Sequence, residues 1–194
     1  MTLTRSAMKS SITRTVGVGA TAALVVGLML APQQASAADI PAPDGRSELT
    51  AAASCWEAKQ RDPAAESGVY WILTPKLGAA EQFYCDQQTD GGGWVLIGRG
   101  REGWSTSNEG WGTPAQVRST VTGQAAFSPR QLPSRTIEAL LNGNTVSSLS
   151  DGIRLRRATT ADGSDWQEST FTFASPRDEW LWQFDNEQRV DTWN

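Results

Sequence analysis

The sequence predicts an α+β fold in which a helix packs against a twisted antiparallel sheet. Short runs rich in β-branched and aromatic residues alternate with turn residues over positions 67–97. An alanine-rich segment at 47–60 precedes them and carries apolar residues at helical spacing. The final third alternates apolar and polar residues once more, which indicates further strands.

The segment 47–60 is predicted to be the first helix. Ser47 is suited to cap its amino end, and Asp62-Pro63 would end it. This helix would present Cys55 and Trp56 to the sheet. Its helical spacing is carried by Leu49, Ala52, Ala53 and Trp56.

Three strands are predicted in the amino-terminal half of the sheet, over 67–73, 82–85 and 94–97. Turn residues separate the first two strands. Three consecutive glycines, Gly91 to Gly93, precede the third strand and allow positive φ angles and close approach of the backbone. Together these runs predict a small antiparallel meander with a tight glycine turn.

A resemblance to a known family rests on three motifs: Ser67-Gly68-Val69-Tyr70, Tyr84-Cys85-Asp86 and Thr89-Asp90-Gly91-Gly92-Gly93-Trp94. In order and spacing they resemble the opening of a fibrinogen C-terminal-like domain, and they are most similar to its bacterial secreted branch with YCD and GGGW motifs. The resemblance covers roughly residues 54–99. It implies a fibrinogen-like fold, with the helix disulfide-linked to the sheet, and a structural role for Asp86 and Asp90 around the glycine turn.

The amino terminus has the pattern of a secretory signal peptide. Arg5, Lys9 and Arg14 precede an apolar stretch at 16–31, and the Ala-Ser-Ala at 35–37 fits a cleavage site. A membrane anchor is the alternative, but spanning takes about 20 apolar residues. Removing these three basic and no acidic side chains takes the formal charge from −4 to −7. An acidic chain of this kind argues against nucleic acid or anionic membrane as a partner.

These observations predict four segments and a secreted, extracellular location. A signal peptide spans 1–37 and a flexible linker 38–46. A fibrinogen-like amino-terminal subdomain follows at 47–100, and 101–194 is a divergent remainder of the same domain. The family's domain ordinarily continues further, with a second disulfide, a calcium loop and a ligand pocket. An incomplete domain, from a fragment of a longer secreted protein, is therefore expected.

The chain has two cysteines and no histidine. In an oxidising compartment, pairing of Cys55 with Cys85 is the default expectation. Two free buried thiols are the alternative, and a metal site would need further ligands that are not histidine. The lack of imidazole excludes histidine-based triads from this sequence, so that any chemistry would rest on carboxylates, lysine or hydroxyls. No enzymatic activity is predicted.

Beyond residue 100 a polar, glycine-rich run to 114 predicts a surface loop. A second helix is predicted at 134–141, with Ser134 as its N-cap and Gly143 as its left-handed stop. The last predicted strands are 152–156, 166–173 and 179–184.

Trp104 and Trp111 lie in the predicted loop and are the candidates for contact with a ligand. The strand and helix tryptophans are expected to fill the core instead. Asp162 and Asp165 could supply oxygens to calcium, although they do not follow a twelve-residue calcium loop and a plain turn is favoured. The core candidates are Trp56, Trp71, Trp94, Trp180 and Trp182.

Five arginines form the basic clusters of the chain, and we expect them to pair with nearby carboxylates or, alternatively, to recognise an anionic ligand. They are Arg99, Arg101, Arg154, Arg156 and Arg157.

The resemblance implies a secreted, non-catalytic recognition or adhesion module that binds an extracellular glycan or protein. The sequence contains no motif for a cofactor, and calcium is the one cofactor left open. No membrane span is expected after the signal peptide is cleaved. The alternatives are a structural domain of a larger exported protein and, with the least support, a secreted hydrolase, since no spacing indicates a catalytic carboxylate pair.

Overall fold

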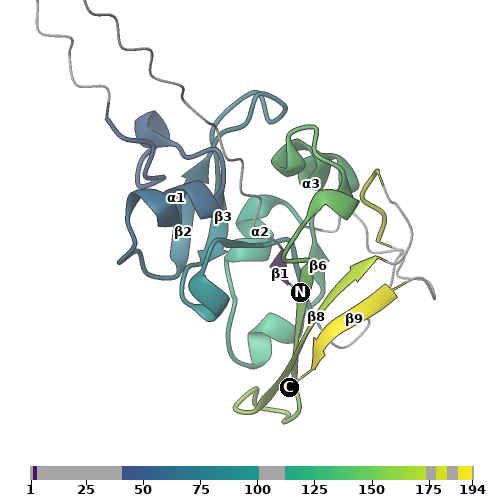
Figure 1. Ribbon diagram of the computed structural model, residues 1–194. Helices are drawn as coiled ribbons and strands as arrows, with labels where there is room; N and C mark the ends of the chain where they lie inside the picture. Colours follow the sequence, from purple (N-terminus) through teal and green to yellow (C-terminus); the bar gives the residue numbers. More distant parts are fainter. Residues whose placement is uncertain (1, 4–40, 101–111, 174–177, 183–187, 194) are drawn as a thin grey trace, which may run out of the picture. The chain divides into compact units, whose positions relative to one another are not determined.

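The computed structural model of the protein describes residues 2–3, 41–100, 112–173, 178–182 and 188–193. Its main feature is a seven-stranded sheet in the order β2-β3-β4-β1-β7-β8-β9, with antiparallel pairing between all neighbours (Figure 1). The strands are β1 (Thr2–Leu3), β2 (Gly68–Ile72), β3 (Glu81–Asp86), β4 (Trp94–Leu96), β7 (Ile153–Ala158), β8 (Trp166–Phe173) and β9 (Gln188–Trp193).

The predicted amino-terminal meander is confirmed as β2, β3 and β4. Gly68 lies opposite Cys85, and Cys85 lies opposite Val95, so the three strands share one register. Alternate side chains are buried along each strand. Because Cys85 lies opposite Val95 and Asp86 opposite Trp94, the buried side chains of β4 lie on the other face of the sheet from Cys85. The buried members are Tyr70, Ile72, Phe83, Cys85, Trp94 and Leu96.

The single helix predicted over 47–60 is wrong in its extent. A 3-10 turn spans Glu48–Thr50 after Ser47, which is its N-cap as expected. Ala52 then pairs with the outer side of β2, because its N–H donates to the Trp71 carbonyl at 3.0 Å and its carbonyl accepts from Leu73 at 2.8 Å. Those sheet hydrogen bonds are incompatible with a continuous helix.

The first α-helix, α1 (Cys55–Arg61), starts after this bridge. The Ser54 hydroxyl caps it by accepting from the Glu57 N–H at 3.0 Å. Of the four residues that carry the helical spacing, Leu49 lies in the 3-10 turn and Trp56 in α1, whereas Ala52 and Ala53 lie between the two. Cys55 is the first residue of α1 because the chain leaves this bridge just before it.

β1 lies inside the sheet, between β4 and β7. Thr2 is opposite both Leu96 and Arg154, and Leu3 is opposite both Val95 and Ile153. Both residues of β1 belong to the predicted signal peptide.

Two of the three strands predicted in the carboxyl-terminal part are present in the structure. β7 and β8 match the strands predicted at 152–156 and 166–173. The strand predicted over 179–184 is wrong for its described part, since 178–182 contains no strand. Trp180 and Trp182 are buried and Leu181 is 49% exposed, so the predicted alternation is present. Aromatic packing, with the Trp180 and Trp182 rings 5.3 Å apart, fixes the segment without ladder hydrogen bonds.

Helix α3 (Ser134–Leu141) has the predicted bounds, but its N-cap is Pro133 and Ser134 is its first residue. Asn142, with φ 52°, is the left-handed residue that ends it, and Gly143 follows with φ 91°. Helix α2 (Pro114–Arg118) and a two-stranded sheet of β5 (Gly98–Arg99) and β6 (Arg130–Gln131) complete the regular structure, together with 3-10 turns at Thr89–Gly91, Gln124–Phe127 and Val146–Ser148.

The main core cluster includes residues of α1, of α3 and of the sheet. The Thr74 hydroxyl, 1% exposed, donates to the Ala139 carbonyl of α3 at 2.7 Å and so ties the β2–β3 turn to this helix. Within the described residues, no helix combines the length and the apolar composition that crossing a bilayer requires. Large buried core residues include Phe83, Ile97, Leu132, Ile137, Ile153 and Trp180.

Candidate functional site

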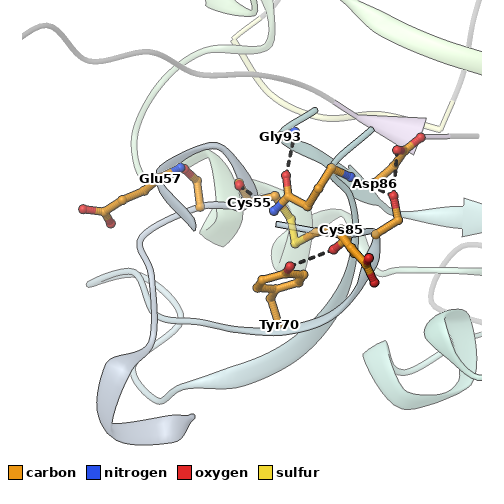
Figure 2. Close-up of a disulfide and its surroundings, with 10 residues drawn as sticks. Cys55, Glu57, Tyr70, Cys85, Asp86 and Gly93 are labelled. Carbon is orange, nitrogen blue, oxygen red and sulfur yellow. Dashed lines mark hydrogen bonds between the residues drawn. A yellow bond between two sulfur atoms is a disulfide. The ribbon is translucent and has the colours of Figure 1, made fainter. Parts of the chain in front are cut away.

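The Cys55–Cys85 disulfide joins α1 to β3, as predicted. The two Cα atoms are 5.5 Å apart and both side chains are buried (Figure 2). Cys85 lies in the middle of the meander, and Cys55 is the first residue of α1, so the bond fixes the helix start to the sheet. The Tyr70 hydroxyl, on the adjacent strand β2, donates to the Glu66 carbonyl at 2.7 Å.

Gln87 connects the disulfide to the glycine turn. Its side chain is completely buried, its amide donates to the Cys55 carbonyl at 2.9 Å, and its carbonyl accepts from the Gly93 N–H at 2.9 Å. The bond from Gly93 gives a buried backbone N–H its acceptor. Gln87 therefore links the start of α1 to the glycine turn. This role was not predictable from the sequence, because Cys55 lies 32 positions away from Gln87 in the chain.

The glycine turn needs glycine for two reasons. Gly92 and Gly93 have φ angles of 78° and 87°, in the region that residues with a Cβ rarely adopt. A Cβ on Gly93 would also lie 2.7 Å from Cε3 of Trp56, and a Cβ on Gly92 would lie 2.4 Å from the Gln87 carbonyl oxygen. The backbone thus approaches α1 as closely as only glycine allows.

Asp86, the last residue of the YCD motif, accepts hydrogen bonds on both carboxylate oxygens. Oδ1 accepts from the Gln88 N–H at 3.0 Å, the Thr89 N–H at 3.1 Å and the Ser67 hydroxyl at 3.0 Å. Oδ2 accepts from Nη2 of Arg154. Burial alone raises the pKa of Asp86, but the hydrogen bonds from Arg154 and from the two backbone N–H groups outweigh it and hold that pKa well below its usual range.

Arg154 is the buried cation of this cluster. Its side chain is 2% exposed, and its guanidinium carbon lies 4.8 Å from the centre of the Trp94 ring. Nη2 is bonded to Asp86, while Nε and Nη1 are buried without an acceptor among the residues that the structure describes. We call Asp86, Trp94 and Arg154 the motif cluster. It comprises an ionised acid, an aromatic face and two unused donors of one guanidinium.

The other predicted arginines are placed as follows. Arg156 pairs with Glu168 at 3.7 Å and lies over the Trp166 ring. Arg157 donates to Gln167 at 2.8 Å. Arg99 donates to four backbone carbonyls, including Ser128 at 2.8 Å, and so clamps a loop. Arg101 lies outside the described residues. Pairing with a carboxylate, as expected, is found for Arg154 and Arg156.

The predicted ligand tryptophans, Trp104 and Trp111, lie outside the described residues. Asp162 is on the surface, where Oδ1 accepts from the N–H and the hydroxyl of Ser164 at 3.1 and 2.9 Å. The Asp165 N–H donates to the Thr160 hydroxyl at 3.1 Å. This is the geometry of a polar turn. The described residues hold no group of three or more acidic, cysteine or histidine side chains placed to bind a metal.

A small apolar cavity of about 40 Å³ lies beside the disulfide. That volume admits a few water molecules at most, far less than a sugar. Its apolar lining includes Cys55, Ile72, Val95, Ile97, Ile137 and Leu149.

No protein-family model matches the chain. Over 74 residues, 38% of its length, it is 31% identical to fibrinogen C domain-containing protein 1 of Mus musculus, and it covers 16% of that protein. Over 85 residues, 37% of its length, it is 34% identical to angiopoietin-4 of Homo sapiens and covers 17% of it. The chain therefore spans about a sixth of the length of the curated relatives that it matches.

Among solved structures, the chain is similar to the fibrinogen-like globe domain of human ANGPTL6. The match covers 73% of this chain and 55% of that one, at 19% identity and a TM-score of 0.38, which is too low to assign a fold by itself. The sequence likeness thus relates part of the chain to fibrinogen C domain proteins, and the disulfide-linked helix and antiparallel sheet stand on the structure of the chain itself.

Proposed function

We propose that the mature protein is a secreted, non-catalytic recognition module of the fibrinogen-related kind, and that it binds an extracellular glycan or protein. The observation that carries the proposal is the likeness, at 31% and 34% identity, to a fibrinogen C domain protein and to an angiopoietin. The bacterial branch of that family, with its YCD and GGGW motifs, is the relationship that we propose for the chain.

The electrostatics of the motif cluster support a structural rather than a catalytic role for its acid. A general acid needs a pKa near the working pH, whereas Arg154 and the surrounding N–H groups keep Asp86 ionised. The Asp162 carboxylate is likewise bonded to the backbone of its own turn. These two acids stabilise backbone geometry, which is compatible with a module that presents a surface for binding.

We place the ligand contacts at Trp104 and Trp111, because tryptophans in the loop predicted from the sequence would offer flat apolar faces on which sugar rings stack. The cavity beside the disulfide is far too small for a sugar, so it is not the glycan site that we propose. Calcium, if the ligand requires it, would be bound near Asp162 and Asp165.

The test is retention of the mature protein on immobilised glycans, including N-acetylated sugars, with and without a calcium chelator. We expect binding that Trp104→Ala or Trp111→Ala weakens at least tenfold. Leu49→Ala is the matched control, since Leu49 is 93% exposed and lies outside the loop. Equal binding by all three variants would contradict the assignment of the tryptophans.

The structural-domain alternative predicts no retention on any glycan or surface protein. The hydrolase alternative predicts release of soluble products from the same glycans, a result that would contradict the non-catalytic proposal.

A further inference from the structure

The position of β1 in the sheet has a consequence for the mature protein. We call the strand position between β4 and β7 the β1 slot. Its occupants, Thr2 and Leu3, are removed if the signal peptide is cleaved after Ala37, as predicted. The edges of β4 and β7 would then face each other across a gap one strand wide. Unpaired strand edges are templates for another extended segment.

The residues that border the slot are poorly suited to water. With β1 in place, Ile153 and Arg154 on β7 are 1% and 2% exposed, and Leu96 on β4 is 9% exposed, so removal of β1 would open these residues to water. Backbone groups in such surroundings need partners. Arg154, opposite the first residue of β1, also keeps Nε and Nη1 buried without an acceptor in the described part of the chain. A buried guanidinium donor without an acceptor is costly, and a carboxylate is the acceptor it pairs with best.

The amino terminus of the mature protein resembles that of the precursor, with a polar residue in second place and a large aliphatic residue in third. The precursor starts Met1-Thr2-Leu3, and the mature chain would start Ala38-Asp39-Ile40. In the register of β1, Asp39 would lie opposite Leu96 and Arg154, and its carboxylate would supply the missing acceptor. Ile40 would lie opposite Val95 and Ile153, on the apolar face of the sheet.

A chain cannot reach its own slot with this segment. Gly45 is held beside β2, because its carbonyl accepts from the Trp71 N–H at 2.7 Å. Gly45 lies one strand spacing outside β2, and β1 lies three spacings on the other side of β2, so the slot is four strand spacings away, about 19 Å. The position of Ile40 in the slot is also shifted by about 10 Å along the strand direction. The five residues from Gly45 back to Ile40 span about 18 Å at full extension, less than the combined distance of about 21 Å.

We propose that the β1 slot of the mature protein binds the amino-terminal segment Ala38-Asp39-Ile40 of a second copy. The incoming segment adds an antiparallel strand between β4 and β7, with the Asp39 carboxylate bonded to Arg154 and the Ile40 side chain packed against Ile153. When each copy donates its segment to the other, the result is a closed, two-fold symmetric dimer. This inference rests on the predicted cleavage and is independent of the proposed ligand.

The test uses the exported mature protein, with its amino terminus established by mass spectrometry. Sedimentation equilibrium over a wide concentration range measures the association constant. We expect a reversible dimer. Asp39→Ala should lower the association constant about tenfold or more, the effect of losing a charge-assisted hydrogen bond. Ile40→Asp should abolish the dimer, because it places a charge against the apolar face of the sheet.

Asp44→Ala is the matched control, since it removes one carboxylate from the same tail and leaves 38–40 intact; it should dimerise like the parent. Hydrogen exchange supplies the second readout. Amides of β4 and β7 that face the slot should be protected in the dimer and should exchange faster in Ile40→Asp, while β2 and β3 stay protected.

Three results would overturn the proposal. The first is a parent protein that remains monomeric at every concentration, whether or not its slot amides are protected. The second is a dimer that Asp39→Ala and Ile40→Asp leave unchanged. The third is an exported chain that starts at a residue other than Ala38.

Discussion

Arg154 on β7 donates a hydrogen bond to Asp86 on β3, although β4 and β1 lie between these strands in the sheet. The Arg154 side chain runs across the Trp94 ring to make this contact. One ion pair therefore connects the amino-terminal meander to the carboxyl-terminal strands. Its two residues are 68 positions apart in the chain, so it forms only when both halves of the sheet are assembled.

Asp86→Asn tests how much this pair stabilises the fold. The substitution keeps the shape of the side chain but leaves the buried Arg154 charge without its counterion. We expect the free energy of unfolding to fall by about 3 kcal/mol, as for other buried pairs that lose one partner. Urea unfolding measures it. Asp178→Asn, at an exposed acid, should cost less than about 0.5 kcal/mol, and an equally small loss for Asp86→Asn would show that the pair is not stabilising.

The stability of the protein should depend on pH through Asp86. Its folded pKa lies below the value of about 3.8 that it has when unfolded, so between these values the unfolded chain binds more protons than the folded one. The free energy of unfolding therefore rises with pH in that window. The contribution of Asp86 is fully present above about pH 5 and is lost as the pH falls below 4.

Urea unfolding at a series of pH values checks this dependence. The acid limb of the stability curve should be shallower in Asp86→Asn than in the parent. Identical acid limbs in the two proteins would assign the acid sensitivity to other carboxylates.

The disulfide should contribute about 3.5 kcal/mol, the chain-entropy value for a loop of about 31 residues. Replacing both Cys55 and Cys85 by alanine removes this constraint, and reduction of the parent protein under urea should produce a similar loss. Thiol titration of the unfolded, exported protein should find no reactive cysteine before reduction. Two reactive thiols per molecule before reduction would contradict both the disulfide and its predicted contribution to stability.

Structural features that depend on neighbouring residues were predictable from the sequence, whereas those that depend on distant residues were not. The meander was predictable because the alternation of Trp94, Val95 and Leu96 and the glycines before them are local signals. The disulfide followed from there being two cysteines. The roles of Gln87 and Arg154 were not predictable, since each depends on partners brought close only by the fold.

Two local errors have the same origin. Helical spacing over 47–60 could not reveal that Ala52 pairs with β2, because sheet hydrogen bonds to a distant strand override local propensity. The alternation around Leu181 correctly predicted that Trp180 and Trp182 are buried, but it wrongly predicted a strand. There the indole N–H of Trp182 donates to the Leu132 carbonyl at 2.8 Å, a contact between distant residues that anchors the segment.

Gly93→Ala should be among the most destabilising substitutions in the glycine turn. It combines an unfavourable φ of 87° with a Cβ placed 2.7 Å from Cε3 and 3.0 Å from Cα of Trp56. The Cα belongs to the backbone of α1, which the disulfide holds in place, so the contact is not relieved by a side-chain rotation. We expect a loss of about 3 kcal/mol, of which the backbone conformation alone accounts for about 1 kcal/mol.

Gly78→Ala separates the two causes. Gly78 has a similar φ of 76°, but a Cβ there would meet nothing within 4 Å. It should therefore lose only the conformational part, about 1 kcal/mol in urea unfolding. Equal losses for the two variants would mean that the turn requires glycine for its backbone angle alone. A larger loss for Gly93→Ala, accompanied by a change in tryptophan fluorescence, would establish that the close approach to Trp56 is what excludes a side chain from the GGGW motif.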